Sequence, residues 1–195
     1  MIGENKKLIK GSISQHLDVV DSLNNDEILD EITKLSLLIA NSIKNKGTIF
    51  WCGNGGSAAD SQHLAAELVC RFNKDRPPLA SRALSTDTSI LTSISNDYSY
   101  EEIFSRQISA LAKPKDILVG ISTSGNSKNV DLAICKANEI GCNTIAFLGK
   151  DGGRIINSAK NYIVIGSDNT ARIQEAHILV GHLIIEAIEK ELGFS

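Results

Sequence analysis

Apolar residues recur at helical spacing through the first part of the chain, before any strand pattern appears. The first series lies in "LIKGSISQHLDVVDSL" and the second in "NNDEILDEITKLSLLIANSIKNKG". Asn25 or Asp26 can cap the second helix, and Gly47 can end it. The pattern therefore predicts a helical N-terminal extension over residues 1–46, followed by the rest of the fold over 47–195.

From residue 47 onwards, short apolar runs alternate with stretches of helical spacing. The runs that predict strands are "TIFWC", residues 82–85, "KDILVGIS", "NTIAFLG" and "NYIVIG". Helical spacing returns in residues 57–72, in "NVDLAICKANEIG" and in "NTARIQEAHILVGHLIIEAIEKEL", which Asn169 or Thr170 can cap. This alternation predicts an α/β fold: a doubly wound parallel sheet flanked by helices, with ligands at the carboxyl ends of its strands.

Length and composition favour one domain that acts on small molecules. A chain of 195 residues, 42% hydrophobic and 22% charged, supports one sizeable core, so we expect a single domain over 1–195. The net charge of −3 and the lack of a Lys/Arg-rich run argue against nucleic acid or membrane partners. Neither a signal-peptide pattern nor a membrane-length apolar run occurs, so we expect a cytoplasmic protein. The four cysteines lack CxxC spacing and are expected to be reduced, structural thiols.

A glycine cluster follows the first predicted strand. Gly53, Gly55 and Ala58 satisfy the G-x-G-x-x-A pattern of dinucleotide-binding loops. That function also needs an acidic residue at the end of the next strand. Asp75 has the right separation but lies in a charged loop, and Asp87 follows the strand but is too distant. NAD binding and a plain structural turn stay open as alternatives, while the helix start behind the glycines favours an anion.

A hydroxyl-rich loop, "ISTSGNS", follows the clearest strand. Ser122, Thr123, Ser124 and Ser127 surround Gly125 just before a predicted helix. Hydroxyls and free backbone N–H groups at a helix start form a neutral cradle for a phosphate monoester. Because no "GK[ST]" occurs here, the loop favours phosphate binding over phosphoryl transfer. A serine-rich loop without function is the alternative.

Candidate catalytic side chains lie on two predicted helices. His63 and Glu67 are four residues apart, hence on one helix face. His182 stands in "ILVGHLII", which predicts a helix buried on most of its circumference. Gln174 lies eight residues earlier, about 80° round the helix and roughly 12 Å along it. His63 and Glu67 could be a solvated surface pair and His182 a core residue, but Gln174 and His182 could also reach one pocket, though not by pointing the same way.

Five segments together resemble the phosphoheptose isomerase family of SIS (sugar isomerase) domains. In chain order they are "CGNGGSAADSQHLAAEL", "ISNDYSYEEIFSRQ", "GISTSGNS", "GKDGG" and "ARIQEAHILVGH". The resemblance runs from about Gly47 to the C-terminus. It implies a flavodoxin-like sheet, a homotetramer and a sugar-phosphate substrate. The implied reaction converts sedoheptulose 7-phosphate to D-glycero-D-manno-heptose 7-phosphate, the first step towards the heptose of bacterial surface glycans.

The same resemblance assigns roles to individual residues. Substrate binding falls to Asn54, Gly55, Gly56, Ser57, Glu67, Asn96, Asp97, Ser122, Thr123, Ser124, Ser127 and Gln174, the serine and threonine cluster holding the phosphate. A Zn²⁺ site falls to His63, Glu67, Gln174 and His182. Glu67 and His182 also match the catalytic acid/base pair. The two roles of Glu67 oppose each other, because zinc stabilises a carboxylate and weakens it as a base.

A non-catalytic protein of the same fold is the nearest rival. The initiator-associating adaptor of bacterial replication resembles the chain around "GNGGSA" and "ARIQE" but lacks the matching glutamate and the late histidine. Glu67 and His182 are both present here, which favours the enzyme. Ala171 stands where some relatives carry aspartate, so sugar-hydroxyl recognition is expected to differ there.

Overall fold

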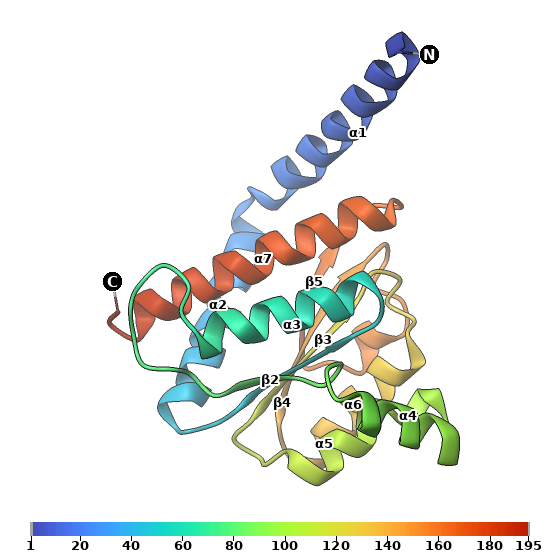
Figure 1. The fold of residues 1–195 in the computed structure, drawn as a ribbon. Coiled ribbons are helices and arrows are strands. Elements are labelled where there is room, and N and C mark those ends of the chain that lie inside the picture. Colours follow the sequence, from blue (N-terminus) through green and yellow to red (C-terminus); the bar gives the residue numbers. More distant parts are fainter. Residues whose placement is uncertain (1, 195) are drawn as a thin grey trace.

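Five strands form one parallel sheet in the computed structural model, which describes residues 2–194 (Figure 1). The strands are β1 (Ile49–Gly53), β2 (Ser81–Ala83), β3 (Ile117–Ser122), β4 (Asn143–Gly149) and β5 (Asn161–Ile165). Their order across the sheet is β2-β1-β3-β4-β5. β1 and β3 pair from Ile49↔Ile117 to Gly53↔Ile121, so the loops that follow them leave the sheet side by side.

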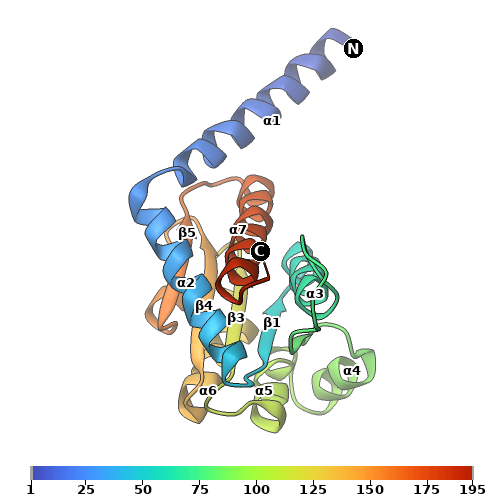
Figure 2. The same cartoon turned by 90° about the vertical axis from the view of Figure 1, so that its left-hand side faces the viewer.

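Helices cover both faces of the sheet, as Figure 2 shows. They are α1 (Ile2–Leu23), α2 (Asp26–Lys44), α3 (Gly56–Val69), α4 (Thr88–Asp97), α5 (Ser105–Leu111), α6 (Lys128–Ile140) and α7 (Thr170–Glu191). Short 3₁₀ turns lie at Tyr100–Glu102 and Ile155–Asn157. One core cluster joins the sheet to α2, α3 and α7, and a second joins it to α5 and α6. The predicted doubly wound architecture is confirmed.

Alternation along the strands explains the two core layers. In β1, Ile49 and Trp51 belong to the first cluster, while Phe50 and Cys52 belong to the second. Neighbouring side chains of a strand point to opposite faces, so a strand buried on both faces must be apolar throughout. Every residue of β1 and β3 is buried. The continuous apolar runs in the sequence therefore report central strands.

Most predicted boundaries agree with the structure, with small corrections. Asn25 caps α2 by accepting a hydrogen bond from the N–H of Ile28, and Asn169 caps α7. The second helix ends at Lys44, before Gly47, and α3 ends at Val69 rather than at residue 72. The strand expected at 82–85 lies at 81–83. Helices α4 and α5 were not predicted.

The two N-terminal helices differ in their surroundings. α2 is part of the core layer, through Ile32, Leu35 and Ile39. α1 projects away from the body of the molecule, in blue in Figure 1, and touches it near the start of α7. Its exposed apolar side chains are Ile2, Leu8, Ile9, Ile13 and Leu17. Among residues 2–194, no helix is long and apolar enough to cross a membrane.

Two of the cysteines depart from expectation, whereas the burial of α7 agrees with it. The buried residues of α7, among them Ile173, Ile185 and Glu189, spread over more than half of its circumference, and Leu183, 36% exposed, lies on the remaining strip. All four thiols are free. Cys52 and Cys142 are buried as expected of structural thiols, whereas Cys70 and Cys135 are exposed.

A buried ion pair joins α7 to the loop that follows α3. Arg76 and Glu189 form a 2.7 Å contact, with side chains 0% and 3% exposed. Glu189 also accepts hydrogen bonds from the backbone N–H groups of Phe72, Asn73 and Lys74. Burial alone would raise the pKa of Glu189, but the hydrogen bonds from Arg76 and the loop and the charge of Arg76 lower it overall. The carboxylate is therefore a fixed anchor for the loop.

We predict that Glu189→Gln destabilises the fold by about 3 kcal/mol at pH 7, because it leaves Arg76 buried without a counter-charge. The folded-state pKa of Glu189 lies below its unfolded value of about 4.3, so the stabilisation exists above that pH and is lost as pH falls through the folded pKa. Urea unfolding of wild type and variant at several pH values measures both effects.

Glu191→Gln is the matched control, since Glu191 pairs with Lys44 two residues further along α7 but at the surface. Its effect should stay below about 1 kcal/mol. Equal losses in the two variants, or a loss in Glu189→Gln that is the same at pH 7 and below pH 4, would contradict the anchoring role.

Candidate active site

The loops after β1 and β3 meet at the carboxyl edge of the sheet. Asn54, in the first loop, exchanges two side-chain hydrogen bonds with Asn129, near the start of α6, at 2.9 and 2.8 Å. Tyr100 donates a third hydrogen bond, at 2.8 Å, to Oδ1 of the Asn54 side chain. The predicted first loop and the predicted phosphate loop are therefore one joined surface, and Tyr100 ties the segment after α4 to it.

The loop after β3 has the form of an anion cradle. Ser122, buried at the strand end, donates a 3.0 Å hydrogen bond to Ser127, the residue that precedes α6. Ser124 lies 3.5 Å from Ser122 through their hydroxyl oxygens. Gly125 has φ +64°, and a Cβ there would lie 2.1 Å from the carbonyl oxygen of Gly152, so the loop packs tightly on the turn after β4. Hydroxyls and the N-terminus of α6 thus face the same place.

The first loop presents a second helix N-terminus. Gly55 has φ +55° and precedes α3 without a side-chain cap, and the N–H groups of Ala58 and Ala59 donate to its backbone carbonyl oxygen. Gly56 faces Gln174 of α7: a Cβ on Gly56 would lie 3.4 Å from Gln174 Cγ. Ser57 is buried, and its N–H donates to the Asn54 carbonyl oxygen. Small residues here let α7 approach the loop.

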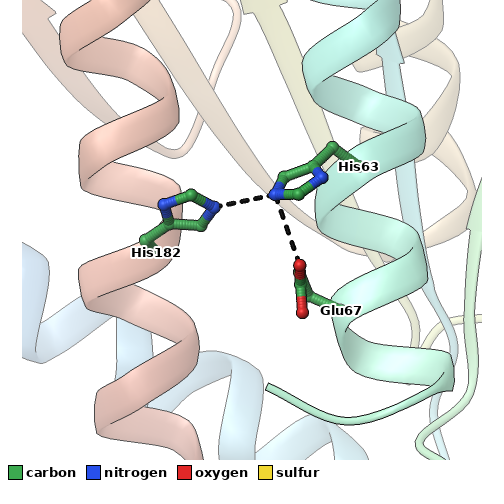
Figure 3. A group of neighbouring side chains, drawn as sticks. All are labelled: His63, Glu67 and His182. Atoms are coloured by element: carbon green, nitrogen blue, oxygen red, sulfur yellow. Dashed lines mark hydrogen bonds and ion pairs between the residues drawn. The ribbon is translucent and has the colours of Figure 1, made fainter. Parts of the chain in front are cut away.

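Three ligating side chains converge between α3 and α7, as Figure 3 shows. The Nε2 atoms of His63 and His182 lie 2.9 Å apart, so one ring donates a hydrogen bond to the other. Glu67, one turn along α3 from His63, places a carboxylate oxygen 3.3 Å from His63 Nε2. The three donor atoms lie within 4.8 Å of one another. His182 is therefore half-buried in a polar group rather than a core residue.

A close approach of the two helices permits this convergence. Gly181 precedes His182, and a Cβ there would lie 2.6 Å from both Cδ atoms of Leu64, the residue after His63. A side chain at 181 would therefore force either the buried Leu64 side chain or the two helices to shift. The pair Gly181 and Leu64 thus sets the separation at which His63 and His182 can share a point.

The groups around His182 change the pKa of its imidazole. Burial lowers the pKa of His182, and the neighbouring His63 lowers it further, while Glu67 acts in the opposite direction. A lowered pKa keeps this imidazole neutral near pH 7. Neutral imidazole can ligate a metal or exchange protons with a substrate oxygen.

Gln174 binds a carboxylate next to the trio. Its Nε2 donates to Oδ1 of Asp60 at 2.6 Å, and Asp60 lies on α3 three residues before His63. Burial raises the pKa of Asp60 to about 6, although the hydrogen bond from Gln174 and the nearby His63 oppose the rise. Oδ2 of Asp60 is buried and has no hydrogen-bond partner among residues 2–194.

Asn96 and Asp97 lie at the end of α4, and their side chains hydrogen-bond to each other at 2.8 Å. Both are exposed. Their segment reaches the first loop through Tyr100, three residues after Asp97. A role in substrate binding for this pair stays a prediction.

The structure brings together most of the predicted residues and adds others that sequence reasoning missed. Asn54 and the serine loop are joined, and His63, Glu67 and His182 form one group, whereas Gln174 pairs with Asp60. The missed residues are Asp60, Tyr100 and Asn129. Asp60 could have been found from its spacing, since a residue three before His63 shares its helix face. Tyr100 and Asn129 carry no such signal.

Comparison with known proteins shows the family of the chain. Residues 14–149 match the SIS domain family. A phosphoheptose isomerase of Clostridium acetobutylicum is 46% identical over 188 residues, which cover 96% of each chain. One of Geotalea daltonii is 50% identical over 184 residues, 94% of this chain and 95% of the relative.

A solved structure gives the same result in three dimensions. The phosphoheptose isomerase GmhA from Neisseria gonorrhoeae superposes with a TM-score of 0.88 at 40% identity, covering 95% of this chain and 98% of that one. These relatives favour an enzyme over the adaptor alternative. The chain belongs to the phosphoheptose isomerase family of SIS domain proteins.

Proposed function

We propose that the protein interconverts D-sedoheptulose 7-phosphate and D-glycero-D-manno-heptose 7-phosphate. The observation that carries this proposal is the group of His63, Glu67 and His182, held between α3 and α7. The hydroxyl-lined anion cradle lies towards the start of α3, where Asn54 hydrogen-bonds to Asn129 of α6. The relatives named phosphoheptose isomerase support the same reaction. An aldose–ketose isomerase needs a phosphate anchor and a proton-transfer pair, and the site offers both.

The reaction moves one hydrogen between neighbouring carbons. A base removes a proton from C1 of the ketose, which leaves an enediol, and a proton is then returned to C2. Meanwhile the oxygen on C2 gains a proton and the oxygen on C1 loses one, so that the carbonyl shifts to C1. We assign the carbon-bound proton to Glu67 and the oxygen-bound protons to His182.

The phosphate orients the sugar for this transfer. We place it in the loop of Ser122, Thr123, Ser124 and Ser127, where hydroxyls and the start of α6 favour an anion. The first loop, with Asn54, Gly55, Gly56 and Ser57, then contacts the sugar between the phosphate and Glu67. Fixing both ends of the substrate reduces the entropy lost on reaching the transition state.

The donor set also fits Zn²⁺. Two imidazole nitrogens and one carboxylate oxygen are ligands that Zn²⁺ accepts, and the three lie within 4.8 Å of one another. We propose that His63, Glu67 and His182 hold the ion, with Gln174 as a further ligand. When bound, zinc would polarise the carbonyl and stabilise negative charge on the enediol oxygens.

The finer biological setting belongs to the same proposal. We infer a homotetramer, because the apolar side chains that α1 exposes in a single chain would be covered by other subunits. We place the enzyme in the cytoplasm, as the first step of ADP- or GDP-heptose synthesis for lipopolysaccharide, capsule or related glycans. We treat the chain as one functional domain, with residues 1–46 serving oligomerisation and 47–195 binding substrate.

Glu67→Gln tests the proposed base. The amide keeps the shape of the side chain but cannot take a proton, so turnover of sedoheptulose 7-phosphate should fall at least a thousandfold while the circular dichroism spectrum stays unchanged. Glu139→Gln, on the exposed side of α6, is the control and should keep wild-type turnover. Turnover near wild type in Glu67→Gln would remove Glu67 from the mechanism.

Metal removal tests the zinc assignment. Prolonged dialysis against a chelator should lower the turnover of the wild-type protein at least tenfold, and one equivalent of Zn²⁺ per chain should restore it. His63→Ala should bind Zn²⁺ more weakly than wild type, since it removes one of the three donors. Full activity in metal-free protein, checked by elemental analysis, would reject a catalytic role for the ion.

A further inference from the structure

His182 has an aromatic neighbour outside the proton-transfer group. The ring of Phe72 stacks on its imidazole, with centroids 5.3 Å apart and planes 29° from parallel. On another side, the ring of His63 meets it edge-on, at 5.1 Å and 67°. An imidazole in contact with two rings has little freedom to rotate about its side-chain bonds.

The loop that carries Phe72 is itself anchored to α7. The Phe72 N–H donates to Glu189 at 3.1 Å, and the N–H groups of Asn73 and Lys74 donate to the same carboxylate. Glu189 follows His182 by seven residues, two helical turns, and so lies on the same side of α7. One helix face therefore carries both the histidine and the carboxylate that holds the ring against it.

Arg76 extends this anchor to the other helix. Its guanidinium pairs with Glu189 at 2.7 Å and donates to the backbone carbonyls of Glu67, at 2.8 Å, and Leu68, at 2.9 Å. Those carbonyls belong to the last turn of α3, which carries the Glu67 side chain. The loop, the end of α3 and the end of α7 are thus joined through two buried charges, and Phe72 is the part of this assembly that touches His182.

We propose that Phe72 is a positioning residue for His182, held in place by the Arg76–Glu189 pair. The ring fixes the imidazole in the orientation that points Nε2 at His63 and towards Glu67. This inference rests on the roles proposed above for His182. It assigns Phe72 no contact with substrate, so its removal should affect turnover and metal binding rather than substrate affinity.

The test compares Phe72→Leu with Phe72→Tyr. Loss of the ring should lower kcat about tenfold, leave KM within about twofold and weaken Zn²⁺ binding to the metal-free protein about tenfold by isothermal titration calorimetry, in line with the strength of an aromatic pair. Phe72→Tyr keeps the ring and should restore kcat and the Zn²⁺ dissociation constant. Phe72→Met removes the ring at similar apolar volume and repeats the test should the leucine variant fail to fold.

Phe194→Leu is the matched control. Phe194 is also partly buried against the same core cluster, so this variant reproduces the packing loss away from His182, and it should keep wild-type kcat and Zn²⁺ affinity. The inference is overturned if the ring-free variants keep both, if Phe72→Tyr loses as much as they do, or if Phe194→Leu loses as much. Zn²⁺ binding is measured without substrate, so a wild-type protein that binds the ion but does not isomerise the sugar rejects the proposed function alone.

Discussion

The close packing of α7 on α3 at Gly181 and Leu64 is the constraint on which the site depends. This contact also brings His63 and His182 together, because His63 precedes Leu64 in the chain and His182 follows Gly181. With the helix backbones this close, two imidazoles from distant parts of the sequence come within a hydrogen bond of each other. Glu67 lies one turn further along α3, at the exposed edge of the same helix interface. The proposed chemistry thus depends on the contact between Gly181 and Leu64, neither of which has a side chain that can take part in the reaction.

Buried charge stabilises the far end of the same helix pair. Arg76 and Glu189 are almost fully buried, and each has several hydrogen-bond partners besides the other. A buried ion pair contributes little net stability compared with apolar packing, but it tolerates few alternative arrangements. Its location, between the end of α3 and the loop that holds Phe72, suits a part of the fold whose geometry matters more than its stability. The anion cradle lies at the other end of α3, where the strands end.

The sequence predicted the fold where burial or helix capping requires particular residue types. Strands β1, β3 and β4 are continuous apolar runs because both faces of the sheet are covered, and Asn25 and Asn169 mark helix starts through their capping side chains. Helix α4 has no buried residue and α5 spans only seven, so neither leaves a strong apolar period. The five motifs located the loops and the trio, and the resemblance assigned their roles. The Gln174–Asp60 pair and the Arg76–Glu189 pair join residues more than a hundred positions apart, and no local pattern predicts such contacts.

The central claim is that Glu67 and His182 transfer a proton between two carbons of a heptose phosphate. The most direct measurement follows sedoheptulose 7-phosphate and the purified protein by NMR in D₂O. We expect that the aldose heptose 7-phosphate appears and carries deuterium at C2, because the side chain of Glu67 is 22% exposed and the proton that it holds can exchange with solvent. Failure to form the aldose, with and without added Zn²⁺, would contradict the isomerase. Formation of an aldose with no deuterium at C2 would contradict exchange between solvent and the proton that Glu67 holds.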